Sequence, residues 1–183
     1  MVDKNGSFIF VQRMNRRPRD IAYAGIIAAL YAALTILLAP ISYGVYQVRI
    51  AEVMTVLPFV YPPAIFGLLI GCLIANIFGG NGLPDIIFGS MFTLLAGYLT
   101  YLSSKIRKPF IGIILAPLPP VLINAFGVAL YLAPITGMSY FFVVQMIGVG
   151  QIAACYLLGL PFLVFLVSRK KQLFSDNDKY MVN

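Results

Sequence analysis

The sequence predicts an all-α integral membrane protein with six transmembrane helices, a short second helix and both termini in the cytoplasm. Of the 183 residues, 61% are apolar and only 10% are charged, and the mean hydropathy is +0.92. Soluble domains carry about 25% charged residues, and a soluble chain of this length cannot bury so much apolar surface. The positions of the charges then set the number and direction of the helices.

The basic residues, which give the chain a net charge of +7, lie in three clusters, with Arg49 as the outlier. The clusters are Lys4, Arg13, Arg16, Arg17 and Arg19; then Lys105, Arg107 and Lys108; then Arg169, Lys170, Lys171 and Lys179. Short basic flanks of apolar segments mark the cytoplasmic side of a membrane. The charge is therefore explained without a nucleic-acid partner, and all three clusters are expected on one side.

The uncharged stretches between the clusters predict the helices. The first, 20–39, is long enough to cross a hydrocarbon core of about 30 Å. The stretch from Val53 to Pro84 is interrupted by prolines, which end helices, and a single helix there would put the second basic cluster on the wrong side. In chain order the predicted helices are 20–39, 51–60, 62–77, 85–104, 110–133 and 140–168.

The helix at 51–60 is only about 15 Å long at the helical rise, which is half of a membrane. Such a half-span is tolerated where protein neighbours or a wet cavity satisfy its ends. The membrane domain is expected to cover 20–168, between a basic cytoplasmic tail at 1–19 and a polar cytoplasmic tail at 169–183.

Composition also excludes several kinds of chemistry. The chain has no histidine, which excludes an imidazole base, a histidine-ligated metal and a Ser-His-Asp triad. Cys72 and Cys155 lie in apolar runs and are interpreted as small buried residues. The sequence contains no Walker-type phosphate loop. We therefore expect no catalytic residue, no cofactor and no metal site.

Side chains that carry a charge or an amide at membrane level are expected in the outer half of the bilayer. Such groups are costly in lipid and usually face a bundle interior or an aqueous cavity, so a one-sided set predicts an outward-facing binding pocket. The candidate pocket residues are Arg49, Glu52, Asn76, Asp85, Asn124, Gln145 and Gln151. Because the two glutamines are six residues apart, at most one of them is expected to point at a ligand.

Structural roles compete with binding at these positions. Arg49 and Glu52 are three residues apart and would form an ion pair at a helix end. Asp85 would cap the helix that begins there. Asn76 and Asn124 would serve as hydrogen-bonding contacts between helices.

The chemistry of such a pocket can be outlined. Two carboxylates with several amides favour a ligand rich in hydrogen-bond donors, such as a neutral or cationic heterocycle with N–H groups. Tyrosines at the same level either stack on a planar ring or form an interfacial aromatic belt. These tyrosines are Tyr43, Tyr46, Tyr131 and Tyr140.

Small residues repeat at a spacing of four in the first helix. One row is Ala24, Ala28 and Ala32, and the next is Gly25, Ala29 and Ala33. Small residues at this spacing let a second helix approach closely. The rows therefore predict tight packing, either within the chain or against an external partner.

The motifs QVRIAE and GLLIGCLIAN, followed by DIIFGS, resemble the queuosine-precursor transporter (QueT) family. The resemblance extends from about Asp20 to Ser168 and includes LPPVLINAFGVAL. Members are substrate-binding S components of energy-coupling factor (ECF) transporters. The resemblance implies a six-helix S-component bundle that lies in the lipid of the bacterial plasma membrane. This bundle would capture a deazaguanine base from outside. The resemblance also implies two kinds of partner, a transmembrane T component and two cytoplasmic ATPases.

The resemblance assigns roles to particular residues. The small-residue face at Ala28, Ala29, Ala32 and Ala33 corresponds to the surface that docks on the T component. In the pocket, Glu52 or Asp85 would accept hydrogen bonds from the ring N–H and amine groups, and Arg49 would bind the ring carbonyl or orient Glu52. Asn76, Asn124 and a glutamine would complete the ring edges. Gln151 stands where the family often has glutamate. If Gln151 contacts the ligand, this difference implies another cargo or another protonation state of the cargo.

Two other functions are open to a small multi-pass membrane protein. An integral-membrane enzyme acting on lipids or isoprenoids is disfavoured because the chain has no carboxylate-rich metal motif and no Ser/His arrangement. A self-contained channel or secondary carrier is disfavoured because the inner half of the predicted bundle lacks a polar path.

Overall fold

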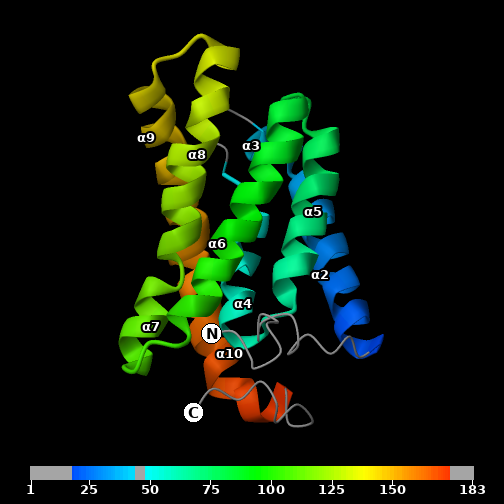
Figure 1. Ribbon diagram of the computed structural model, residues 1–183, viewed down its shortest axis with the longest axis vertical. Helices are drawn as coiled ribbons and strands as arrows, with labels where there is room; N and C mark the ends of the chain where they lie inside the picture. The colour runs from blue at the N-terminus through cyan, green and yellow to red at the C-terminus, as the bar shows by residue number, and fades with distance from the viewer. Residues whose placement is uncertain (1–17, 44–47, 174–183) are drawn as a thin grey trace, which may run out of the picture.

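The computed structural model describes residues 18–43 and 48–173, with side chains described up to Arg169. These residues form helices joined by short turns and contain no strand (Figure 1). Most of the two predicted tails, 1–19 and 169–183, and also Tyr46, lie outside the described residues.

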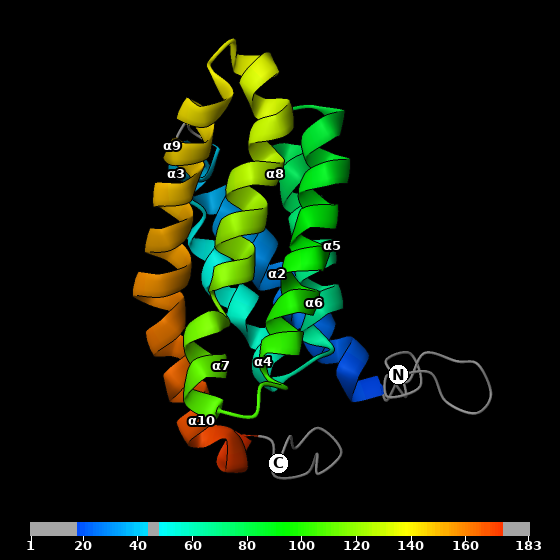
Figure 2. The same ribbon diagram turned by 60° about the vertical axis from the view of Figure 1, so that its left-hand side comes forward.

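The described chain runs repeatedly between the two ends of an elongated bundle, which are called here the upper and lower ends as drawn in Figures 1 and 2. The start of α2 and the end of α10 both lie at the lower end. In chain order the elements are α2 (Pro18–Leu37), α3 (Ala39–Ser42), the 3₁₀ helix η1 (Ile50–Val56), α4 (Leu57–Val60), α5 (Ala64–Phe78), the π-helix η2 (Asp85–Gly89), α6 (Ser90–Ser103), α7 (Pro109–Leu115), α8 (Leu118–Thr136), α9 (Tyr140–Ile152), the π-helix η3 (Ala153–Gly159) and α10 (Leu160–Leu173).

Four helical stretches within the described residues are long and apolar enough to cross a membrane. They are Pro18–Leu37, Asp85–Ser103, Pro109–Thr136 and Tyr140–Arg169. Two apolar stretches, Ile50–Val60 and Ala64–Phe78, are shorter; the 15 residues of α5 measure about 22 Å at the helical rise. The all-α multi-pass class is confirmed. Six full spans and the side on which the termini lie remain predictions.

The predicted helix at 110–133 differs from the observed one. It is divided into α7 and α8 at Ala116 and Pro117, and α8 continues to Thr136. Proline lacks the backbone N–H that the helix needs and clashes with the preceding turn, which accounts for the break at Pro117. The upper end of α8 stops at Gly137, whose φ of 69° is the left-handed conformation that favours glycine.

The packing of α2 on α5 depends on two glycines. A Cβ at Gly67 would lie 2.7 Å from the carbonyl oxygen of Ala24, and one at Gly71 would lie 2.8 Å from that of Ala28. Any side chain at these positions would push the helices apart. The row that contains Ala24, Ala28 and Ala32 therefore serves packing within the chain.

Two of the four residues predicted to dock on a partner are corrected by this packing. Ala28 and Ala32 are buried, so they are not available to an external partner. Ala29 and Ala33 are exposed in the adjacent row, about 100° around α2. A Cβ at Gly25, in the same row, would meet nothing within 4 Å.

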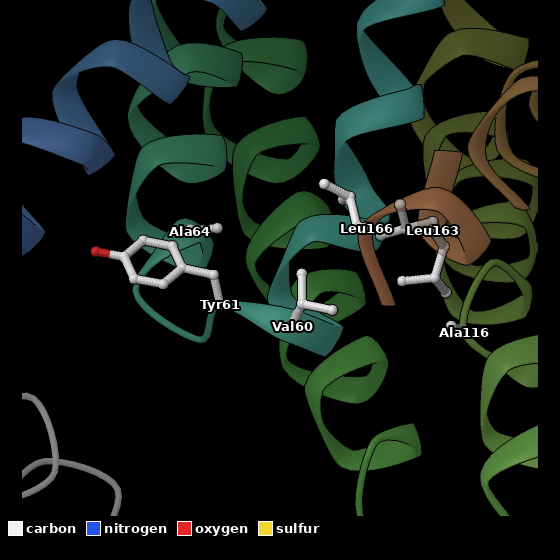
Figure 3. Close-up of a cluster of buried hydrophobic side chains, with 7 residues drawn as sticks. Val60, Tyr61, Ala64, Ala116, Leu163 and Leu166 are labelled. Carbon is white, nitrogen blue, oxygen red and sulfur yellow. The ribbon is translucent and has the colours of Figure 1, made fainter. Parts of the chain in front are cut away.

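An apolar cluster, whose side chains are drawn in Figure 3, lies toward the lower end of the bundle. It joins α4, α5 and α10 and consists of Val56, Val60, Tyr61, Ala64, Ala116, Leu163 and Leu166. At its edge the hydroxyl of Tyr61 donates a hydrogen bond of 2.8 Å to Oδ1 of Asp20, at the start of α2. The polar cluster described next lies nearer the upper end, where α5 ends and η2 begins.

Candidate functional site

Six of the seven predicted binding residues are buried inside the bundle, although they come from five different elements. Arg49 precedes η1 and Glu52 lies in it, and the other four are Asn76 of α5, Asp85 of η2, Asn124 of α8 and Gln151 of α9. Each is at most 5% exposed. Buried charges and amides survive in a fold when they are paired or when they serve a ligand.

Gln145 does not belong to this group, because it is exposed. The buried face of α9 is formed by Val143, Ile147, Gly150 and Gln151. Gln145 lies off that helical face, so the prediction that it lines the pocket is corrected, whereas Gln151 faces inward.

Asp85 organises the upper side of the cluster. Its Oδ2 accepts hydrogen bonds from Nη2 of Arg49 at 3.3 Å and from Nδ2 of Asn81 at 3.0 Å. Its Oδ1 accepts one from the hydroxyl of Tyr131 at 2.6 Å. The ion pair of Arg49 is thus with Asp85 of η2 rather than with Glu52, and the Asp85 side chain makes these contacts instead of capping its own helix. Both oxygens of this carboxylate are already engaged.

Asn76 joins α5 to the same region, as predicted for a contact between helices. Its Nδ2 donates to the backbone carbonyl of Asp85 at 2.8 Å. The close fit requires Gly89, because a Cβ there would lie 2.8 Å from Nδ2 of Asn76 and 2.9 Å from Oδ1 of Asp85. The end of α5 and η2 can therefore pack this closely because Gly89 has no side chain.

Glu52 occupies the other side of the cluster. Its Oε1 accepts a hydrogen bond of 2.5 Å from the hydroxyl of Tyr31 in α2. Asn124 lies beside the same carboxyl. The sulfur of Cys155 contacts Oε1 of Gln151 and the backbone carbonyl of Glu52. The carboxyl is therefore bordered by α2 and α8, and η3 contacts the backbone of η1.

Three polar atoms within this cluster lack hydrogen-bond partners among the described residues. They are Nε of Arg49, Oε2 of Glu52 and Oδ1 of Asn76; a fourth such atom, Oγ of Ser42, belongs to α3. A buried polar group without a partner costs about 1–3 kcal/mol. Three in one small region provide two acceptors and one donor for a bound molecule.

The profile of the QueT transporter family matches residues 21–168. The chain belongs to the QueT transporter family. Over 78 residues it is 37% identical to the queuosine precursor transporter QueT of Lactococcus lactis subsp. cremoris (strain MG1363), a match that covers 42% of this chain and 46% of that relative. The aligned part thus spans about half the length of the relative. No solved structure matches the chain.

Membership of the QueT transporter family makes the chain a transport protein rather than an enzyme, which confirms the prediction and removes the lipid or isoprenoid enzyme as an alternative. The buried cluster is therefore a candidate solute site. All of its residues lie inside the matched range of 21–168.

Two tyrosines of this QueT-family chain were not predicted as hydrogen-bond donors in the site. The sequence predicts Tyr131 only as a stacking or aromatic-belt residue, and it predicts no role for Tyr31. The sequence holds a signal for Tyr31, because it lies on the helical face of Ala28, Ala32 and Thr35, and a buried tyrosine hydroxyl usually has a partner.

The other tyrosines have separate roles. The ring of Tyr43 lies over the guanidinium of Arg49, 5.6 Å from centroid to Cζ, and its hydroxyl donates to the carbonyl of Ala75 at 2.5 Å. Tyr43 is half-buried and outside the long helices, and burial raises the pKa of its hydroxyl. Tyr140 is turned away, since its hydroxyl donates to the carbonyl of Phe126 at 3.0 Å.

The two cysteines are buried, as predicted, and neither forms a disulfide, yet both touch the polar cluster. The sulfur of Cys72 accepts a hydrogen bond from Oγ1 of Thr93 at 3.2 Å and lies 3.5 Å from Nδ2 of Asn76. Cys155 contacts Thr55 at 3.8 Å. The described residues contain no cluster of metal-ligating side chains.

Proposed function

We propose that this chain is the substrate-binding S component of an ECF-type importer in the bacterial plasma membrane. It captures a queuosine precursor, a deazaguanine base, in the buried polar cluster and delivers it together with a transmembrane T component and two cytoplasmic ATPases. Family membership and the printed name of the Lactococcus relative support the cargo. The single observation that carries the binding role is the set of unpartnered polar atoms on Arg49, Glu52 and Asn76.

These atoms complement the edge of a guanine-like ring. That edge presents an amine donor, a ring N–H donor and a carbonyl acceptor side by side. Oε2 of Glu52 and Oδ1 of Asn76 are acceptors, and Nε of Arg49 is a donor. The types and numbers of the free groups therefore match those of a deazaguanine.

The contacts also divide the roles of the two carboxylates. Asp85 is saturated by Arg49, Asn81 and Tyr131 and holds Arg49 in place. Glu52 keeps one free oxygen, so it is the carboxylate that accepts from the ligand. Asn124 lies beside Glu52, and Asn124 and Gln151 are proposed to contact the remainder of the ring.

Glu52→Gln is expected to weaken binding of a 7-deazaguanine precursor by roughly tenfold, because the amide NH2 group takes the place of the free acceptor Oε2 and cannot accept a hydrogen bond from the ligand. The measurement is isothermal titration or ligand-induced thermal shift of the purified protein in nanodiscs, with guanine, riboflavin and biotin as comparison ligands. The fold is expected to survive, because the amide oxygen still accepts from Tyr31.

The matched control is Asp20→Asn, which alters a buried carboxyl that also accepts from a tyrosine but lies at the lower end of the bundle, away from the polar cluster. It is expected to leave ligand affinity unchanged. Equal affinity in the wild type and Glu52→Gln would remove Glu52 from the site. If the wild-type chain shows no binding of deazaguanines up to their solubility limit, this cargo is excluded.

For the partner, we propose that Ala29 and Ala33 dock on the T component. Small exposed residues at a spacing of four allow close approach between helices in lipid, where packing drives association. Ala29 and Ala33 form the exposed row of α2 next to the row that packs on α5. The same helix thus carries one small-residue row for internal packing and a second for a partner.

The double change Ala29→Leu and Ala33→Leu is expected to reduce co-purification of the T component and ATPases by at least about tenfold, because leucine keeps the partner helix at a distance. Ligand binding is expected to stay at the wild-type level, since both side chains are exposed. Ala29→Ser with Ala33→Ser, which keeps both residues small, is the control and should retain the complex. Normal recovery of the complex with leucine would show that docking lies elsewhere.

A further inference from the structure

We propose that Tyr31 is a positioning residue for ligand binding, whose hydroxyl holds the Glu52 carboxyl so that Oε2 stays turned toward the ligand. This inference rests on the proposed function and adds to it a residue on the helix that also carries the docking row. It assigns to α2 a direct effect on the affinity of the site.

The contact between Tyr31 and Glu52 joins two fully buried side chains. Tyr31 has no exposed surface and Glu52 is 1% exposed. The hydroxyl and Oε1 are 2.5 Å apart, which is the range of charge-assisted O–H···O⁻ hydrogen bonds. Because Oε1 is taken by Tyr31, the free oxygen of the same carboxyl is the one on the opposite side, Oε2.

The backbone at Glu52 is fixed by other groups. Its carbonyl accepts a hydrogen bond of 2.6 Å from Oγ1 of Thr55 in the same 3₁₀ helix, and it is also contacted by the sulfur of Cys155 in η3. The Tyr31 hydroxyl is therefore not needed to hold η1 in place. What it determines is the orientation of the carboxyl group.

Arg49 is a competing partner for that carboxyl. It acts electrostatically on Glu52, and Nε of Arg49 has no partner among the described residues. Without the Tyr31 hydroxyl, the carboxyl would turn toward Arg49. Nε of Arg49 and Oε2 of Glu52 would then bind each other and would not be available to the ligand. The Tyr31 hydrogen bond keeps the donor on Arg49 and the acceptor on Glu52 separate.

Tyr31 is itself anchored on the α5 side. Its backbone carbonyl accepts from Oγ1 of Thr35 at 2.8 Å. A Cβ at Gly71 would lie 2.8 Å from the Cβ of Tyr31, so α5 passes directly against this residue. The hydroxyl therefore projects from a fixed point toward η1.

Tyr31→Phe tests the proposal, since it removes the hydroxyl and retains the ring. We expect affinity for the 7-deazaguanine precursor to fall by about tenfold with the protein still folded. The matched control is Tyr61→Phe, which removes a buried tyrosine–carboxyl hydrogen bond at the other end of the bundle and should leave affinity unchanged. Thermal unfolding of both variants without ligand measures any purely structural loss.

Combination with Glu52→Gln separates positioning from packing. If Tyr31 acts through Glu52, the double variant binds no more weakly than Glu52→Gln alone. Additive losses, or an affinity of Tyr31→Phe within twofold of the wild type, would overturn the proposal while leaving the proposed function intact. Absence of binding by the wild type would instead count against the proposed function.

A second measurement applies if Tyr31→Phe fails to fold. 3-Fluorotyrosine placed at position 31 keeps the ring and the hydroxyl, and its ¹⁹F resonance reports on the Glu52 contact. We expect the resonance to shift when the precursor binds to the otherwise wild-type chain. A resonance that does not change with saturating ligand would contradict the proposal.

Discussion

Asp85→Asn is expected to destabilise the protein by about 3–5 kcal/mol, the loss typical of a buried ion pair broken by removal of one partner. Arg49 would remain 5% exposed with its positive charge uncompensated. The Tyr131 hydroxyl and the Asn81 amide, which now donate to a carboxylate, would meet a neutral side chain. The free energy of unfolding in mixed micelles, or the thermal midpoint in detergent, measures the effect.

Asn81→Ala is the comparison for this prediction. It removes one of the donors to Asp85 without changing any charge, so we expect a loss of about 1 kcal/mol. If Asp85→Asn were as stable as the wild type, the pair between Arg49 and Asp85 would not support the upper end of the bundle. Asp85 would then be a candidate to contact the ligand, in place of its structural role.

Gly89→Ala is expected to lower ligand affinity by about a hundredfold, which corresponds to about 2.7 kcal/mol. The new methyl group would lie 2.8 Å from Nδ2 of Asn76, 2.9 Å from Oδ1 of Asp85 and 3.2 Å from the Tyr131 hydroxyl. These atoms are held by hydrogen bonds to one another or to the backbone of Asp85. They cannot move aside without displacing the acceptor of Asn76 and the support of Arg49.

Gly97→Ala, farther along α6, is the matched control. A Cβ there would meet Ile65 and Pro58 at 3.6 Å, which is ordinary van der Waals contact, and alanine favours a helix over glycine by about 1 kcal/mol. We expect affinity to be retained and stability to be equal or higher. Wild-type affinity in Gly89→Ala would show that the ligand does not rely on the groups around this glycine.

The sequence was sufficient to predict that most of these polar residues lie together, because buried charges and amides are costly in lipid. It was not sufficient to predict their pairing. Spacing favoured Arg49 with Glu52, whereas the structure pairs Arg49 with Asp85, which is far along the chain. Spacing describes neighbours on one helix only, and here the partner is supplied by η2 packed beside α5.

Helix phase explains the other differences. Gln145 and Gln151 have the same chemistry, and only the set of buried neighbours on α9 decides which of them turns inward. Likewise, the two small-residue rows of α2 look alike in the sequence, and the glycines of α5 determine which one is buried. The break at Pro117 and the π-helical turns at η2 and η3 alter this phase in ways that hydrophobic periodicity does not reveal.

The apolar cluster of the lower half has a consequence for the route of the solute. A polar base that moved from Glu52 toward the lower end would exchange its hydrogen bonds for contacts with Val56, Val60, Leu163 and Leu166, at a cost of several kcal/mol for its unpaired donors and acceptors. The described residues therefore offer no polar route from Glu52 through the lower half of the bundle. Under the proposed function, delivery of the base on that side requires a change in the position of the whole bundle rather than passage through it.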